Sequence, residues 1–234
     1  MYSHIISISS NKVVRFLAKL ALFFSVTCIA IQLLSFATGH GRMLGLISLF
    51  NLDQENNFPS FFSMLLLLFA SLLLVIICTF EKQRANIFFK HWAILALGFL
   101  YMAMDEITSL HEGLIAPIRQ LFGKNLPNFF HWAWVIPGIL VVILVALYFY
   151  KFLLHLPKPS AKKFLFAAFI YLSGAIGMEL INGYYYSFHL NFDFIYVTLT
   201  TIEESLEMAG LVVFIFGLLD YIKSNFAEIK LQIH

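Results

Sequence analysis

The sequence predicts an all-α, polytopic membrane protein whose residues 1–234 form a single transmembrane helical bundle domain. Two observations carry this prediction. Of 234 residues, 61% are hydrophobic and only 12% are charged, and the mean hydropathy is +0.86. Soluble domains are about half apolar, with roughly a quarter of their residues charged. The apolar residues also gather in six stretches, each close to the roughly 20 residues that a helix needs to cross a bilayer core.

The six expected transmembrane helices follow one another with short connections. The first, about 13–37, has basic residues before it, but its apolar part is too long for a signal peptide and no clean A-x-A cleavage site follows. We therefore expect an uncleaved span. The other five spans are expected at about 59–80, 88–112, 129–155, 163–187 and 194–222. Acidic residues interrupt the third, fifth and sixth.

The basic residues predict the orientation of these spans. Cytoplasmic ends carry an excess of Lys and Arg. Here one side holds twelve of the 15 basic residues: Lys12, Arg15, Lys19, Lys82, Arg84, Lys90, Lys151, Lys158, Lys162, Lys163, Lys223 and Lys230. The other side holds Arg42, Arg119 and Lys124. We expect both termini in the cytoplasm, in a bacterial inner membrane or an equivalent one. Residues 41–50 and 113–124 then read as two short interfacial helices on the outer face.

Six acidic residues lie inside the expected spans, and we call them the acidic layer: Asp105, Glu106, Glu179, Glu203, Glu204 and Glu207. At helical rise, Asp105 and Glu179 lie roughly 10 Å below the outer surface and Glu203 roughly 14 Å below it. Three helices thus bring carboxylates to a similar depth. Ionisable residues inside spans usually face the bundle interior or a water-filled cavity, and they mark functional sites.

Helical phase assigns these side chains to faces. If the third span runs unbroken to Glu112, then Asp105 and Glu112 share one face, while Glu106 and His111 point elsewhere. The candidate cation or metal ligands are Asp105, Glu179, Glu203, Glu207, Glu112 and His111. The expected supporting residues around them are Glu106, Glu204, Thr200, Asn182 and Tyr186.

The acidic layer has no basic residue at its own depth in any expected span. A buried, unpaired carboxylate is costly and must be neutralised. Three routes are open: the acids are protonated, they are hydrogen-bonded to neighbours such as Thr200 and Asn182, or a cation lies among them. A divalent metal ion is therefore a candidate cofactor, and nothing indicates a nucleotide or haem. The net charge of +2 is small and scattered, which argues against a nucleic-acid partner.

Three functions compete at this stage. An outward-facing carboxylate site suits binding of a small cation or cationic solute and proton- or cation-linked transport. In that case Glu203 and Asp105 would bind, Glu179 would close the site, and Glu207 would pass a proton inward. Against transport, no helix is expected to be broken at the acidic layer. The nearest breaking residues, Pro137 and Gly138, lie in the fourth span.

The first alternative is a membrane-embedded, metal-dependent hydrolase or lipid-modifying enzyme, in which carboxylates and His hold a metal that activates water. The segment DEITSLHE, residues 105–112, matches no zinc signature such as H-E-x-x-H. The second alternative is an accessory subunit of a larger membrane complex, with the acids buried against a partner. An oligomer is compatible with all three functions, and each places the chain in a lipid bilayer.

Overall fold

The computed structural model describes residues 9–41, 43–123 and 126–226. Arg42, Lys124 and Lys230 therefore lie outside the described residues. The described part is helical, without strands. Its α-helices are α1 (Ser10–Thr38), α2 (Leu46–Phe50), α3 (Phe58–Gln83), α4 (Phe89–Thr108), α5 (Ile115–Phe122), α6 (Val135–His155), α7 (Lys158–Leu172), α8 (Glu179–His189) and α9 (Phe194–Asn225). Short 3-10 turns precede α2, α5 and α6, and a π-helical stretch, Ser173–Met178, joins α7 to α8.

Within the described residues, five helices are long and apolar enough to cross a membrane: α1, α3, α6, the continuous Lys158–His189 helix and α9. A sixth span results if α4 is counted together with the bent segment Glu112–Phe122, whose axis turns by 75°. These helices confirm the expectation of an all-helical protein with several membrane-length apolar helices. The physical reason is that a helix satisfies all its backbone hydrogen bonds within one segment, as the lipid core requires.

Two expected spans have different ends in the structure. The third ends at Thr108 rather than 112, because Ser109 adopts a left-handed conformation (φ 47°, ψ 37°) that a continuing helix does not allow. The fourth begins at Val135 rather than 129, because Asn128–Phe130 form a separate 3-10 turn after Pro127. The others agree with the expected ranges to within a few residues.

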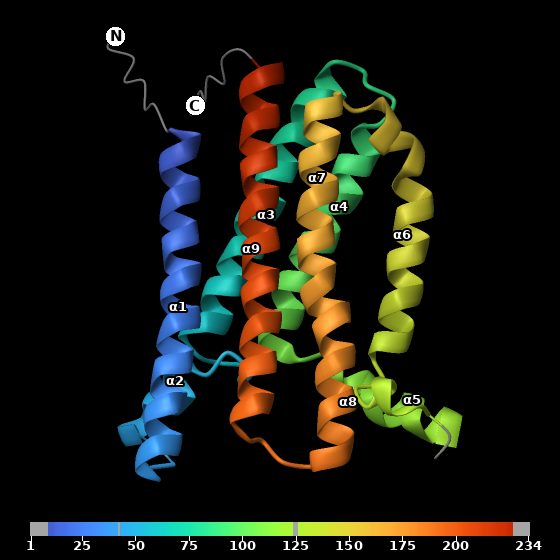
Figure 1. Cartoon of the computed structure of the whole chain (residues 1–234). Helices are drawn as coiled ribbons and strands as arrows, with labels where there is room; N and C mark the ends of the chain where they lie inside the picture. The colour runs from blue at the N-terminus through green and yellow to red at the C-terminus, as the bar shows by residue number, and fades with distance from the viewer. Residues whose placement is uncertain (1–8, 42, 124–125, 227–234) are drawn as a thin grey trace.

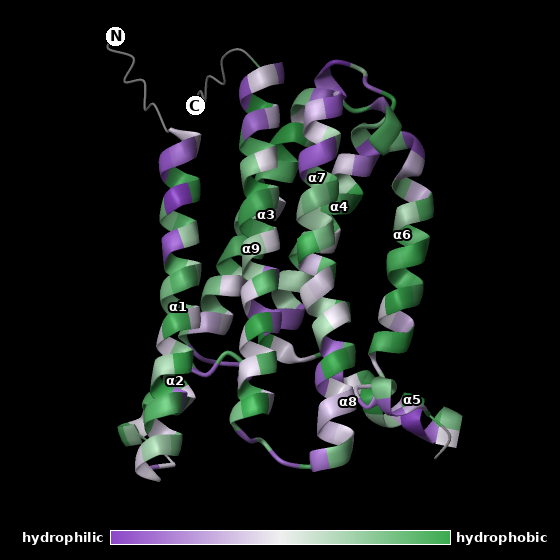
Figure 2. Cartoon of the chain, in the orientation of Figure 1, coloured by the Kyte–Doolittle hydropathy of each residue, from purple (hydrophilic) through white to green (hydrophobic). Residues whose placement is uncertain are grey.

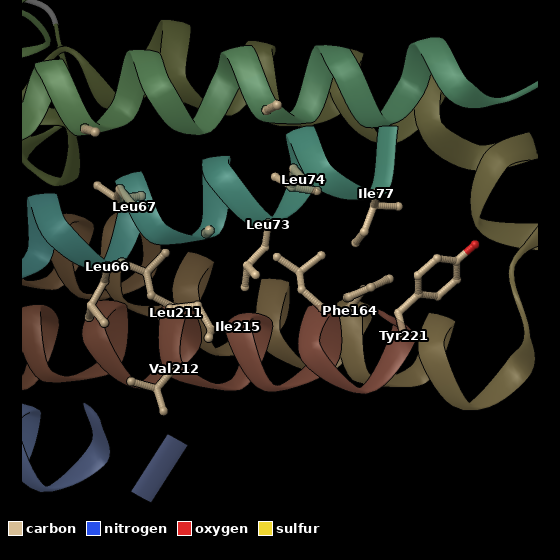
Figure 3. Close-up of a cluster of buried hydrophobic side chains, with 14 of the residues drawn as sticks. Leu66, Leu67, Leu73, Leu74, Ile77, Phe164, Leu211, Val212, Ile215 and Tyr221 are labelled. Atoms are coloured by element: carbon tan, nitrogen blue, oxygen red, sulfur yellow. The ribbon is translucent and has the colours of Figure 1, made fainter. Parts of the chain in front are cut away.

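Helix α9 is the central element, with α1, α3 and α7 packed along it, and α4 packs along α3 (Figure 1). Leu66, Leu73 and Ile77 of α3 pack toward Ile215 and neighbouring residues of α9 in a buried apolar cluster (Figure 3). Lipid tails are as apolar as leucine, so close packing rather than escape from water holds such helices together. Gly210 of α9 permits the closest approach to α7: a Cβ there would lie 2.7 Å from the backbone nitrogen of Tyr171.

The two ends of the bundle differ in character. The start of α1, the end of α3, the start of α7 and the end of α9 lie together at the upper end in Figure 1, and hydrophilic residues colour several of these tips (Figure 2). The short helices α2 and α5 lie at the opposite end. Arg119 fixes α5 there, because its Nε and terminal nitrogen donate to the His131 carbonyl oxygen at 3.1 and 2.7 Å. We call the upper end the basic end and the other the α5 end.

Candidate functional site

The continuous helix from α7 to α8 changes its winding immediately before Glu179. Residues Ser173–Met178 form a π-helical stretch, and Glu179 is the first residue of α8. The helix is not broken at the acidic layer, but its winding departs there from regular α-helical geometry, which the sequence analysis did not expect. Gly174 in this stretch allows the helix to approach α9 closely, because a Cβ there would lie only 2.7 Å from the backbone oxygen of Glu203. Such π stretches are rare and frequently occur at functional sites.

Glu179 and Glu203 form the centre of the site, one from α8 and one from α9. Their carboxyl groups lie within hydrogen-bonding reach of each other. The indole nitrogen of Trp134 donates to Glu179 Oε1 at 2.6 Å. Glu203 itself is only 7% exposed. A pair of carboxyl groups in this position can share a proton or bind a cation, but both cannot carry an unscreened charge at low cost.

Asn182 lies beside this pair and has an unused polar atom. Its Nδ2 donates to Thr200 Oγ1 at 2.7 Å and to Glu203 Oε2 at 3.4 Å. Its Oδ1 is buried and has no hydrogen-bond partner, although the residue is only 2% exposed. Exchanging the amide oxygen and nitrogen would leave the nitrogen unpartnered instead. Buried polar atoms are nearly always paired, so this one calls for an explanation.

The remaining acids of the layer lie around that centre. Glu204 and Glu207 of α9 and Glu106 of α4 are half-buried and close enough to act on one another electrostatically. The hydroxyl of Tyr171, on α7, lies near the Glu207 carboxyl group. The structure therefore brings acids from α4, α8 and α9 near one another, but the α4 residue beside Glu204 and Glu207 is Glu106, which the sequence analysis expected to point elsewhere.

His111 contacts Asp105, contrary to the expectation that it points away. Because α4 ends at Thr108, the chain turns back: the His111 backbone nitrogen donates to Asp105 Oδ1 at 2.9 Å, and His111 Nδ1 lies 2.7 Å from Asp105 Oδ2. Burial lowers the pKa of His111, but the hydrogen bond and charge of Asp105 outweigh it, and the pKa of His111 is raised overall. The Trp134 ring also packs against the His111 ring, with centroids 4.6 Å apart.

Two further acids join the site from the loop between α2 and α3, and the sequence analysis did not select them. Asp53 accepts a hydrogen bond from the Tyr196 hydroxyl at 3.2 Å. The residue is open to water on one side, yet protein surrounds its carboxyl group, and this burial raises the pKa of Asp53 to about 6. Burial likewise raises the pKa of Glu55, and the neighbouring Ser109 side chain opposes that rise. The loop 51–57 thus lies beside the acidic layer.

The outer candidates, Glu112 and Tyr186, have different surroundings. Glu112 is exposed at the start of the bent segment rather than on a face of α4, because the helix has already ended. The Tyr186 ring packs against His131, Trp132 and Tyr196, at centroid distances of 5.0, 5.4 and 5.6 Å. Tyr186 therefore belongs to an aromatic cluster, and its hydroxyl makes no hydrogen bond within the described residues.

The charges of the layer are not balanced by lysine or arginine. Within residues 9–41, 43–123 and 126–226 there are two ion pairs, Asp105–His111 and Lys163–Asp220, and the second lies at the basic end. In the same described residues, no three His, Cys, Asp or Glu side chains are arranged to hold a metal ion. Glu179, Glu203 and Asn182 remain the groups best placed to bind a cation.

Trp134 and Tyr171 are also site residues that the sequence analysis missed. The sequence analysis included Trp134 and Tyr171 in expected spans and assigned no role to them. Asp53 lies in a connecting loop, and depth was derived only for residues inside spans. The one signal in the sequence was the density of polar residues in NLDQENN, residues 51–57, which is unusual in so apolar a chain.

Comparison with known proteins gives one match. No curated protein and no solved structure matches the chain. A family model described as "Domain of unknown function (DUF8692)" matches residues 14–222, which includes all the membrane-length helices and the whole acidic layer. The chain belongs to the DUF8692 family.

Proposed function

We propose that this protein is an integral membrane protein whose acidic layer binds a small cation and couples it to transport. In this proposal the bundle has six spans and two short interfacial helices at the α5 end. Both termini are cytoplasmic, and the site opens toward the outer face. The basic residues at the opposite end support that orientation.

The observation that carries the proposal is the unpartnered oxygen of Asn182 beside Glu179 and Glu203. A bound cation would satisfy that oxygen and both carboxylates at once, because oxygen atoms are the ligands that hard cations prefer. The π-helical stretch adds support, since transporters place their ion sites where helices depart from regular geometry. Glu207 lies one turn farther along α9 and could pass a proton inward.

A stability measurement tests the binding step. Purified protein is heated with chlorides of Na⁺, K⁺, Mg²⁺, Ca²⁺, Mn²⁺ or Zn²⁺. A cation at 100 times its Kd stabilises the fold by about 2.7 kcal/mol, which corresponds to a rise in Tm of roughly 5–10 °C for a chain of this size. We expect such a rise with at least one cation, and we expect Glu179→Gln and Glu203→Gln to abolish it.

The matched control is Asp220→Asn, which removes an acid at the basic end and should leave the rise intact. If both glutamine variants respond to the cation like the unmodified protein, the carboxylates do not bind it. Transport is then tested in liposomes carrying an internal dye for pH or for the identified cation. Movement driven by an imposed gradient supports transport, and binding without movement excludes it.

A second function, a membrane-embedded hydrolase or lipid-modifying enzyme, is favoured by the Asp105–His111 pair. Asp105 holds Nδ1 of the imidazole, and within the described residues Nε2 makes no hydrogen bond. An oriented histidine with a free nitrogen is the arrangement of a general base. Hydrolysis of phospholipid in detergent, without any gradient, and its loss in Asp105→Asn would support this function. Stoichiometric zinc, iron or manganese in the purified protein would add a metal to it.

A further inference from the structure

A cavity lies at the basic end, away from the acidic layer. Its volume is about 570 Å³, within the usual range for small-molecule sites. The ends of α3, α6 and α9 and the start of α4 form its walls. Glu81 of α3 is one of its lining residues and is only 3% exposed. Figure 3 shows Tyr221 at the edge of the apolar cluster, with its hydroxyl directed away from the leucines.

Glu81 has hydrogen-bond partners but no positive partner. Its Oε1 accepts from the Tyr221 hydroxyl at 2.8 Å, and its Oε2 accepts from the Asn86 side-chain amide. Neither donor carries a charge, and Glu81 takes part in no ion pair within the described residues. It also lies in the last turn of α3, where the helix dipole disfavours a negative charge. The cost of burying this negative charge is therefore not offset by a positive partner, and a bound cation would offset it.

The nearest arginine is already engaged. Arg84 donates to the Asn225 carbonyl oxygen at 2.6 Å, and its guanidinium carbon lies 4.6 Å from the centre of the Phe226 ring. Both contacts hold it at the exposed rim of the cavity, and within the described residues it forms no ion pair with Glu81. A cation in direct contact with Glu81 would therefore come from outside the chain.

Several aromatic side chains are among the other residues that line the cavity. Trp92 is 1% exposed and packs against Tyr221 and Phe152, with ring centroids 5.0 and 4.9 Å apart. Phe88 also lines the cavity. Aromatic faces attract ammonium groups and accommodate apolar bodies. An inorganic cation instead needs about six oxygen ligands, and Glu81 is the one carboxylate among the lining residues.

We propose that this cavity binds a small organic ammonium compound, whose ammonium group contacts Glu81 and whose apolar body lies against Trp92 and Phe152. The site is separate from the acidic layer and does not depend on the function proposed for it.

Calorimetric titration of the full-length protein in detergent tests this proposal. The probes are phenethylammonium, tetramethylammonium and hexylammonium chloride, with 2-phenylethanol as the neutral counterpart of the first. We expect saturable binding of at least one ammonium probe with a Kd of about 1 mM or tighter, and none of 2-phenylethanol. The proposal is wrong if no ammonium probe saturates, or if 2-phenylethanol binds as tightly as phenethylammonium.

Glu81→Gln should weaken ammonium binding roughly ten- to hundredfold, because it removes the charge and keeps the shape. Glu203→Gln, in the acidic layer, should leave this binding unchanged. Unchanged binding in Glu81→Gln would overturn the proposal, and if that variant fails to fold, the comparison of charged and neutral probes on the unmodified protein still decides it. Loss of binding in Glu203→Gln alone would move the ammonium site to the acidic layer.

Discussion

Replacing Gly174 by alanine tests whether the contact between the π-helical stretch and α9 holds the site together. The added Cβ would lie 2.7 Å from the backbone oxygen of Glu203 and 2.9 Å from Cγ of Glu207. Carbon and oxygen atoms normally approach no closer than about 3.3 Å, so the two helices must separate by roughly 0.6 Å (3.3 minus 2.7). The obstacle at Glu203 is backbone and cannot rotate away.

The cost follows from two opposing effects. Alanine gains about 1 kcal/mol over glycine inside a helix, and overpacking costs about 1–3 kcal/mol. Because the obstacle is backbone, we take the upper part of that range and expect a net loss of about 1–2 kcal/mol. For a chain of this length the Tm should fall by roughly 2–8 °C. Cation binding at Glu203 should weaken as well.

Thermal unfolding in one detergent at one scan rate measures this change, and Gly98→Ala is the matched control. Gly98 lies within α4 and is exposed, and nothing is within 4 Å of its added Cβ. That variant should show only the helix-propensity gain of about 1 kcal/mol, a rise in Tm of about 2–4 °C. A Tm for Gly174→Ala equal to that of Gly98→Ala would refute the close contact.

Three further predictions concern the groups around the layer. Asp105→Asn should lower the pKa of His111, which an NMR titration measures. That pKa is raised in the folded protein, so the pair stabilises the fold at pH values below the ordinary histidine pKa. The stabilisation is lost as pH rises through the pKa of the folded protein. An unchanged His111 titration would mean that the pair does not form. The pKa of Asp53 is raised from 3.8 to about 6, so the folded protein binds more protons between those values and stability should fall as pH rises through them; Asp53→Asn should flatten that part of the pH–Tm curve. Trp134→Phe keeps the ring and removes the donor to Glu179, which should cost about 1–3 kcal/mol; adding Glu179→Gln should then cost little more, and fully additive losses would show that the two side chains do not interact.

The regular parts of this fold could be predicted from the sequence because lipid imposes a simple rule. Every backbone group in the bilayer core must be satisfied within the segment, so a long apolar stretch becomes a helix of calculable length. The meeting of acids from α4, α8 and α9 followed from the same rule, since rise and depth are linked. Orientation relative to the membrane remains a prediction from the charge of the loops.

The local departures could not be predicted, because their sequence signals are weak. Ser109 adopts a left-handed backbone conformation at the end of α4. Glycine or asparagine usually occupies such a position, so a serine gives no sequence signal for it. Assuming an unbroken helix, the sequence analysis predicted that His111 points away from Asp105. In the structure the two side chains are partners. Several residues before Glu179 are small, but small residues do not distinguish a π-helical stretch from an ordinary α-helix.

These irregular segments of backbone all lie near the acidic layer, and their common location is informative about the environment of the acids. The end of α4, the π-helical stretch before α8 and the loop 51–57 each bring a carboxyl group to the acidic layer: Asp105, Glu179 and Asp53 respectively. Irregular backbone at membrane depth is tolerated only where protein covers it or where it lines a water-filled cavity. If the acids faced lipid, each irregularity would add unsatisfied backbone groups to an already costly charge. Their coincidence therefore favours a polar interior at this level, and it gives the unpartnered oxygen of Asn182 a setting in which water or a cation can reach it.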